Sequence, residues 1–314
     1  MKAMILRAWG GPEQFEHSEV PKPSPGKNQV LVRVRAASVN PVDYKIRRGG
    51  DWANLPMPAI VGYDAAGSVE AVGDNVSHLA QGDDVFYSAR IFGRQGTYAE
   101  YHVEDAEIVA KKPAGLSFEE AASLPLAAIT AYDTIVTFFG TKPGDTVLVQ
   151  AGAGGVGNFA VQLAKAAGAR VIATGRRENE ALIRSLGADE VVDYRAVRFE
   201  DEVNRLTGGR GADAAYDTVG GDVIPRSIGC VRPYGKLASI VSIEGSINAM
   251  ALRNQTFYFG FMERTAAKIS ALAVLAERRQ VRPLIDSTFP LERVGDAHRK
   301  IESGGVKGKI VITI

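Results

Sequence analysis

The chain has 314 residues, 46% hydrophobic and 23% charged, which is typical of a globular protein and long enough for two domains. Its 37 basic and 36 acidic residues leave a net charge of +1, which argues against a protein that binds nucleic acid or an anionic membrane by charge. A single cysteine, Cys230, excludes an internal disulfide, and no uncharged apolar stretch reaches membrane-spanning length, so we expect a protein of the reducing cytoplasm.

Residues 1–124 show short strand-like runs separated by turn signals. Residues 1–7 form such a run and lack the apolar core of a signal peptide. Residues 29–35 alternate polar and apolar side chains with a period of two, and residues 67–72 form a further run. This region is therefore predicted to be rich in β-strands.

Residues 125–280 alternate strand-like and helical segments, which indicates right-handed βαβ units on a parallel sheet. The expected strands are residues 146–150, 170–174, 190–192, 214–218 and 236–241. Strand-like runs return in residues 288–314. We therefore predict an α/β fold in which a doubly wound parallel sheet, residues 125–280, is inserted into a discontinuous β-rich domain formed by residues 1–124 and 281–314. A cleft between the two domains is the expected substrate site.

The first strand of this alternation runs directly into a glycine-rich loop that opens a helix. Gly152 permits the tight turn, Gly154 lets a pyrophosphate approach the backbone, and Gly157 lets the helix pack closely on the strand. The free N–H groups at the helix start face the phosphates in such a site. The expected dinucleotide contacts in the loop are Gly152, Gly154, Gly155, Val156 and Gly157.

The end of the second strand favours NADPH over NADH. NAD sites place an acidic residue there, which binds the ribose 2′-hydroxyl and repels a 2′-phosphate. This chain has Gly175 followed by Arg176 and Arg177. Charge-assisted hydrogen bonds to a phosphate stabilise binding by about 1.5–3 kcal/mol each. The alternative is that both arginines only solvate the start of the next helix, beside Glu178 and Glu180.

Nearly the whole chain resembles the medium-chain dehydrogenase/reductase superfamily, on its zinc-free quinone oxidoreductase branch and close to the alkenal and enone reductases. The resemblance is carried, in order, by residues 10–13, 36–43, 62–67, 96–101, 124–131, 217–221 and 308–311. It implies a Rossmann domain joined to a GroES-like domain. It also implies an NADPH-dependent oxidoreductase that acts on a small molecule as a homodimer.

The resemblance also bears on zinc. Zinc-dependent members carry a cysteine and a His-Glu pair where this chain has Asn40 and Tyr63-Asp64, and only Asp64 among these has a side chain able to bind zinc. The remaining imidazoles are widely separated and are read as surface or core residues: His17, His78, His102 and His298. The protein is therefore expected to be free of metal.

Further cofactor contacts follow from the resemblance alone. It assigns Tyr194 to the 2′-phosphate and Thr130 to the nicotinamide amide. It adds residues on turns and at strand ends, namely Val219, Gly220, Ser242, Phe259 and Phe261. Thr130 is otherwise an ordinary helical threonine, and the two phenylalanines are otherwise core residues.

Without a metal, the substrate needs its own electron sink, as a quinone or an α,β-unsaturated carbonyl has. Donors for the developing oxygen charge are sought among Asn40, Tyr44, Lys45 and Tyr63, with Asp64 holding the local geometry. Many quinone reductases have tyrosine in place of Lys45, whereas alkenal and enone reductases share the run that begins at Asn40. This departure favours an enone over a benzoquinone. Lys45 is otherwise a surface lysine of a basic run.

Two loops, residues 48–56 with Trp52 and residues 88–96, are expected to shape the substrate pocket. Two other functions stay open. One is reduction of an enoyl thioester, and the other is a sensor that binds NADPH without turnover.

Overall fold

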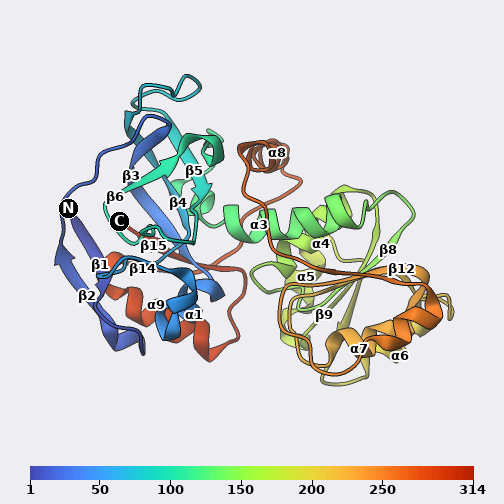
Figure 1. Ribbon diagram of the computed structural model, residues 1–314. Helices are drawn as coiled ribbons and strands as arrows, with labels where there is room; N and C mark the ends of the chain where they lie inside the picture. Colours follow the sequence, from blue (N-terminus) through green and yellow to red (C-terminus); the bar gives the residue numbers. More distant parts are fainter. The chain divides into compact units, whose positions relative to one another are not determined.

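The computed structural model describes residues 1–314, which form two compact units (Figure 1). The first unit combines Met1–Ile129 with Arg264–Ile314, and the second is Thr130–Glu263. The boundaries therefore fall at 129/130 and 263/264, where the sequence suggested 124/125 and 280/281. Helix α3 (Pro125–Tyr132) runs across the first boundary, and α8 (Ala266–Glu277) packs on β7 (Ala110–Lys111) of the first unit. Helical periodicity alone does not show to which unit a helix belongs.

The second unit is built on a six-stranded sheet in the order β10-β9-β8-β11-β12-β13, with every pairing parallel. The strands are β8 (Thr146–Val149), β9 (Arg170–Gly175), β10 (Glu190–Asp193), β11 (Ala212–Asp217), β12 (Val231–Ser239) and β13 (Thr256–Phe259). Counted from β8, this is the 3-2-1-4-5-6 order of a dinucleotide-binding sheet. The doubly wound parallel sheet and its five expected strands are confirmed, and β13 is a sixth strand that the sequence analysis did not include.

Helices cover this sheet between successive strands (Figure 1). They are α4 (Gly157–Ala166), α5 (Glu180–Ser185), α6 (Phe199–Leu206) and α7 (Val223–Ser227). Helix α4 packs on β8 and β9, while α7 packs on β11 and β12. One apolar cluster between the sheet and the helices includes Leu148, Ile172 and Phe199. The short π-helical segment Asp133–Phe138 extends α3 into this unit.

The first unit holds a mixed sheet in the order β14-β15-β3-β4-β5-β7, and β6 also pairs with β3. Its strands are β3 (Gln29–Val39), β4 (Asp64–Val72), β5 (Asp84–Ser88), β6 (Tyr101–Asp105), β7, β14 (Ile285–Pro290) and β15 (Lys309–Thr313). The separate pair β1 (Lys2–Leu6) and β2 (Phe15–Glu19) is antiparallel. The pairing of Ile310 with Val39 joins the two sequence-distant parts of this unit.

The first unit has several helices, namely α1 (Pro41–Gly49), α2 (Phe118–Ala122), α8 and α9 (Val294–Ser303), together with the start of α3. Helix α2 packs on the central strands β3 and β4. Helix α9 packs on α1, β14 and β15. None of the helices combines the length and the apolar character needed to cross a membrane.

Candidate functional site

The glycine loop after β8 has the close backbone packing that its sequence predicts. A Cβ at Gly157 would lie 2.1 Å from the carbonyl oxygen of Ala151, and one at Gly152 would lie 2.9 Å from the Cβ of Ala173. Gly154 differs, because the nearest atom to its Cβ position is the Ala151 oxygen at 3.2 Å. Gly152 and Gly157 are therefore required by the protein's own packing, and Gly154 is enclosed less tightly.

The glycine loop is held by the side chain of Asn158. Asn158 Nδ2 donates to the carbonyl oxygens of Gly154 and Gly155, both at 2.8 Å. The backbone N–H groups of Gly155 and Val156, at the start of α4, donate to no protein acceptor. Such free donors at a helix N-terminus fit a pyrophosphate. The residues of this loop therefore fit a dinucleotide.

The register of β9 and β10 brings Arg176 to Tyr194. Gly175 pairs with Asp193 in these parallel strands, so the residues that follow emerge side by side. Arg176 Nε donates to the Tyr194 hydroxyl at 3.5 Å, and both side chains are partly exposed. Arg177 is exposed on the next turn. This end of the sheet thus presents cationic side chains, and the position at the end of β9 where NAD sites have an acidic residue is a glycine, Gly175.

The turn after β11 is fixed by the buried carboxylate of Asp217. Its Oδ1 accepts from the N–H groups of Val219 at 2.8 Å and Gly220 at 3.0 Å, and its Oδ2 accepts from Ser239 Oγ at 2.8 Å. Gly220 has φ +90°, a conformation that favours glycine. The carbonyl of Ser242 accepts from the next N–H, that of Gly221, at 3.0 Å.

The other predicted cofactor residues of this unit differ in exposure. Val219, Phe259 and Phe261 are 56%, 58% and 65% exposed, so none of these side chains is a core residue. Thr130 is buried on α3, and its carbonyl oxygen accepts from the Tyr216 hydroxyl at 3.3 Å. Because parallel strands end at one edge, the residues after β8, β11, β12 and β13 share the edge that binds ligands in such sheets.

In the first unit, Asp64 is the centre of a buried hydrogen-bond cluster. Its Oδ2 accepts from Ser38 Oγ and from Asn40 Nδ2, each at 2.8 Å. Its Oδ1 accepts from the Leu126 N–H at 2.7 Å, near the start of α3. Lys309 Nζ lies 3.5 Å from Oδ2. The predicted residues Asn40 and Asp64 are therefore brought together, and both are fully buried.

Lys309 belongs to this cluster and was not among the residues expected from the sequence. It begins β15, directly before the apolar residues 310–312, and is only 3% exposed. A lysine at an inward position of an otherwise apolar strand is the signal that identifies it.

A second hydrogen-bonded series starts at Asp43. Asp43 Oδ2 accepts from the Asn40 N–H at 2.8 Å and from the Tyr98 hydroxyl at 2.7 Å. The Tyr98 oxygen lies 3.3 Å from His298 Nε2, and Arg47 Nε donates to His298 Nδ1 at 3.2 Å. Burial raises the pKa of Asp43 to about 7, and burial lowers the pKa of His298 to about 3, with the Arg47 charge adding to the second effect. His298 is therefore a neutral core histidine.

The remaining candidates of this unit lie outside the Asp64 cluster. The Tyr63 hydroxyl is buried without a hydrogen-bond partner, and burial, with a contribution from the Asp43 charge, raises its pKa. Lys45 is exposed on α1, and Tyr44 is half-buried with the Arg48 guanidinium 5.3 Å from its ring.

The residues at Asn40 and Asp64 do not fit a zinc ion. Both Asp64 oxygens already accept from protein donors, and the Lys309 ammonium lies against one of them. No group of three or more His, Cys, Asp and Glu side chains is placed to hold a metal. His102 instead contacts the Tyr87 hydroxyl at 3.0 Å.

The two predicted pocket loops meet. Trp52 and Phe92 make an edge-to-face contact with ring centroids 6.1 Å apart, and the Gly93 N–H donates to the Ala53 carbonyl at 2.9 Å. Both rings are about half exposed, at 51% and 55%. They present an aromatic surface.

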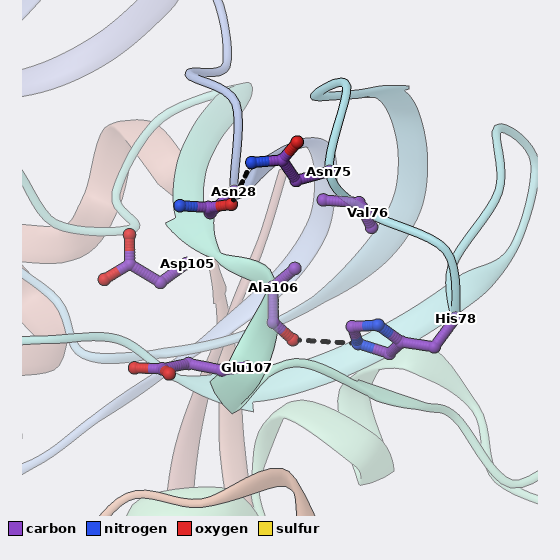
Figure 2. Close-up of a pocket in the computed structure, with 7 residues that line it drawn as sticks. All are labelled: Asn28, Asn75, Val76, His78, Asp105, Ala106 and Glu107. Atoms are coloured by element: carbon purple, nitrogen blue, oxygen red, sulfur yellow. Dashed lines mark hydrogen bonds between the residues drawn. The ribbon is translucent and has the colours of Figure 1, made fainter.

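A hollow of about 400 Å³ lies elsewhere on the first unit (Figure 2). Its lining is mostly polar and consists of Asn28, Asn75, Val76, His78, Asp105, Ala106 and Glu107. Figure 2 shows two hydrogen bonds across its wall, from Asn75 Nδ2 to Asn28 Oδ1 at 2.8 Å and between His78 Nε2 and the Ala106 oxygen at 3.1 Å. None of the predicted site residues lines it.

Comparison with known proteins gives matches over the whole chain. Residues 26–114 match the family profile described as alcohol dehydrogenase GroES-like domain, and residues 186–312 match that of zinc-binding dehydrogenase. The chain is 32% identical to the quinone oxidoreductase of Homo sapiens, over 100% of this chain and 98% of that protein. It is 33% identical to the chloroplastic NADPH-dependent alkenal/one oxidoreductase of Arabidopsis thaliana, over 99% of this chain and 79% of that protein.

Solved structures agree with these matches. An NAD-dependent alcohol dehydrogenase superposes with a TM-score of 0.94 at 36% identity, over 100% of both chains. The quinone oxidoreductase of Escherichia coli complexed with NADPH superposes with a TM-score of 0.90 at 28% identity, also over 100% of both chains.

Proposed function

Because the chain belongs to the quinone oxidoreductase branch of the medium-chain dehydrogenase/reductase superfamily and is an oxidoreductase of that kind, we propose that it transfers a hydride from NADPH to a quinone or an α,β-unsaturated carbonyl compound without a metal ion. NADPH supplies the hydride when bound. The side chains of this protein bind the cofactor and the substrate, orient them and exclude water.

The proposed preference for NADPH is supported by the end of β9. Arg176 and Tyr194 are already in contact, and no carboxylate stands at Gly175 to repel a 2′-phosphate. The superposition on a quinone oxidoreductase complexed with NADPH agrees with this proposal. An NAD-dependent alcohol dehydrogenase superposes as well, so the assay below compares NADPH with NADH.

The observation that carries the metal-free proposal is the occupation of Asp64 by protein donors. A zinc ion at this position would have to share the Asp64 oxygens with the protein donors that already hold them, next to the Lys309 ammonium. An alcohol must be deprotonated and a simple ketone polarised for hydride transfer, which a zinc ion can do, whereas a conjugated acceptor delocalises the arriving charge onto its own oxygen. The proposed substrates are of the second kind.

Asn40 is the proposed donor to the developing oxygen charge. One of its Nδ2 hydrogens is engaged by Asp64 at 2.8 Å, and the other has only a long contact of 3.4 Å to the Ser38 carbonyl. This second hydrogen is the available one. Tyr63, whose buried hydroxyl has no partner, is a second proposed donor. The exposed Lys45 and the half-buried Tyr44 remain proposed contacts, and Trp52 and Phe92 offer stacking surfaces for a planar acceptor.

The test is the loss of NADPH absorbance with the purified protein against a naphthoquinone, a short 2-alkenal, a vinyl ketone and an enoyl thioester. Each reaction is repeated with NADH and with a chelator. We expect turnover of the quinone or the enones, preference for NADPH, and no effect of the chelator. Sensitivity to the chelator would contradict the metal-free proposal.

Two other functions are outcomes of the same assay. Turnover of the thioester alone would identify an enoyl-thioester reductase, and NADPH binding without any turnover would identify a sensor.

We further propose a cytoplasmic homodimer, joined through the nucleotide-binding sheets, whose outer strand β13 carries Phe257 and Tyr258. Light scattering of the purified protein tests the dimer.

A further inference from the structure

Lys309 is a buried lysine with a complete set of hydrogen-bond acceptors. Its Nζ donates to the Val39 carbonyl at 3.1 Å, to Asn40 Oδ1 in a shorter contact, and to Asp64 Oδ2 at 3.5 Å. An ammonium group has three N–H donors, and each has an acceptor here. A neutral amine would have to turn its lone pair toward one of these oxygens. The geometry therefore accommodates the charged form.

The surroundings of Lys309 balance its charge. Burial lowers its pKa, and the negative charges of Asp64 and Asp43 act in the opposite direction. Asp64 comes from β4 and Asp43 from α1, so two elements distant from β15 in the sequence supply these carboxyl groups. A buried ammonium is tolerated only with such partners.

Lys309 also determines how the Asn40 amide is oriented. Asn40 Oδ1 accepts from the ammonium, so its Nδ2 must face Asp64, to which it donates at 2.8 Å. In the flipped orientation the amide hydrogens would face the ammonium and the amide oxygen would face the carboxylate. Both contacts would be repulsive, so the cation and the carboxylate together allow one orientation only.

We infer that Lys309 is a positioning residue, whose ammonium is the charge that holds Asn40 and Asp64 in the arrangement needed to receive the oxygen of a hydride acceptor. The catalytic part of this inference depends on the proposed function, because it gives Asn40 the role of donor. The part that concerns the Asn40 orientation depends only on the contacts of Lys309.

The first experiment is chemical rescue of Lys309→Ala. We expect kcat/KM for the 2-alkenal to fall about 10- to 150-fold, the size of a lost hydrogen bond to a charged group, with NADPH binding unchanged. Ethylammonium can replace the missing group and should restore part of the rate, whereas ethanol or potassium chloride at equal concentration should not. Lys307→Ala, which removes an exposed lysine of the same segment, is the matched control and should show neither loss nor rescue.

Lys309→Met covers the case in which the alanine variant does not fold. Methionine keeps most of the side-chain volume without the charge, so this variant should lose the same activity and should not respond to ethylammonium. Wild-type activity in Lys309→Met, or a loss in a folded Lys309→Ala that ethylammonium leaves unchanged, would overturn the inference.

A second readout is independent of turnover. In NMR spectra of protein labelled with ¹⁵N, the side-chain amide signals of Asn40, identified by their loss in Asn40→Asp, should shift in Lys309→Ala and return with ethylammonium. If the wild type reduces no acceptor but these shifts occur, the proposed function fails and the positioning of Asn40 stands. If the Asn40 signals are the same with and without Lys309, the inference is wrong whatever the activity.

Discussion

Asp43 is expected to make the folded protein less stable as the pH rises. Burial raises its pKa to about 7, from an ordinary value of 3.8, although the Asn40 N–H, the Tyr98 hydroxyl and the Lys309 charge act against this. Below about pH 4 the carboxyl group is protonated in both the folded and the unfolded chain. Between about pH 4 and 7 the unfolded chain loses this proton while the folded chain keeps it, so rising pH favours unfolding. Above about pH 7 both states are ionised and the effect levels off.

The size of the effect follows from the difference of about three pKa units, which corresponds to about 4 kcal/mol in the free energy of unfolding. About 3 kcal/mol of it is expressed between about pH 5 and 8, because the unfolded carboxyl group is already largely ionised at the lower pH. Asp43→Asn keeps the shape and an oxygen that accepts from Asn40 and Tyr98, and it does not titrate.

The assay is urea unfolding of the wild type and of Asp43→Asn at both pH values. The stability of the variant relative to the wild type should rise by about 3 kcal/mol from the lower to the higher pH. His298→Gln is the control of opposite sign, because the lowered pKa of His298, about 3, destabilises the folded protein as the pH falls below its ordinary value of 6.5. A relative stability of Asp43→Asn that is the same at both pH values would refute the reasoning.

Three further predictions concern the second unit. Gly154→Ala should weaken NADPH binding and lower the thermal unfolding temperature less than Gly157→Ala does, since the added Cβ would lie 3.2 Å from a carbonyl oxygen in the first variant and 2.1 Å in the second; fluorescence titration measures the binding and calorimetry the unfolding temperature. Arg176→Ala should reduce the preference for NADPH over NADH, measured as the ratio of kcat/KM values, by about 10- to 150-fold if the lost bond contributes about 1.5–3 kcal/mol, and an unchanged ratio would exclude Arg176 as the phosphate ligand. Burial raises the pKa of the Cys230 thiol to about 12, so iodoacetamide should leave it unmodified in the folded protein and alkylate it after unfolding, which mass spectrometry detects.

Much of the fold was predictable because its signals are local. The run from β8 into the glycine loop joins a strand period to a helix period within a few residues, and the structure confirms both elements. Strand β13 has only four residues and follows an irregular segment, so its period was too short to identify. The unit boundary near α8 depends on packing, which no local pattern contains.

The candidate site was predictable only in part, because its members come from distant positions. Asn40 and Asp64 were found through a resemblance, and they do share a hydrogen bond. Lys45 was predicted because it lies in the same short run as Asn40, but its side chain is exposed. The lysine that contacts Asn40 is Lys309, 269 residues further along the chain. Only the pairing of β15 with β3 brings that side chain into place.

This pairing also sets an order of events during synthesis on the ribosome. Strand β3 is made early, yet its partner β15 emerges only after the whole of the second unit, Thr130–Glu263, has been translated. The second unit has its own sheet and apolar cluster and can begin to fold at that stage, since domains generally fold as units. Until then β3 can pair with β4 and β6, but its end, residues 36–39, has no partner strand and Asp64 has no lysine beside it. The nucleotide-binding fold can therefore form before the buried cluster is complete.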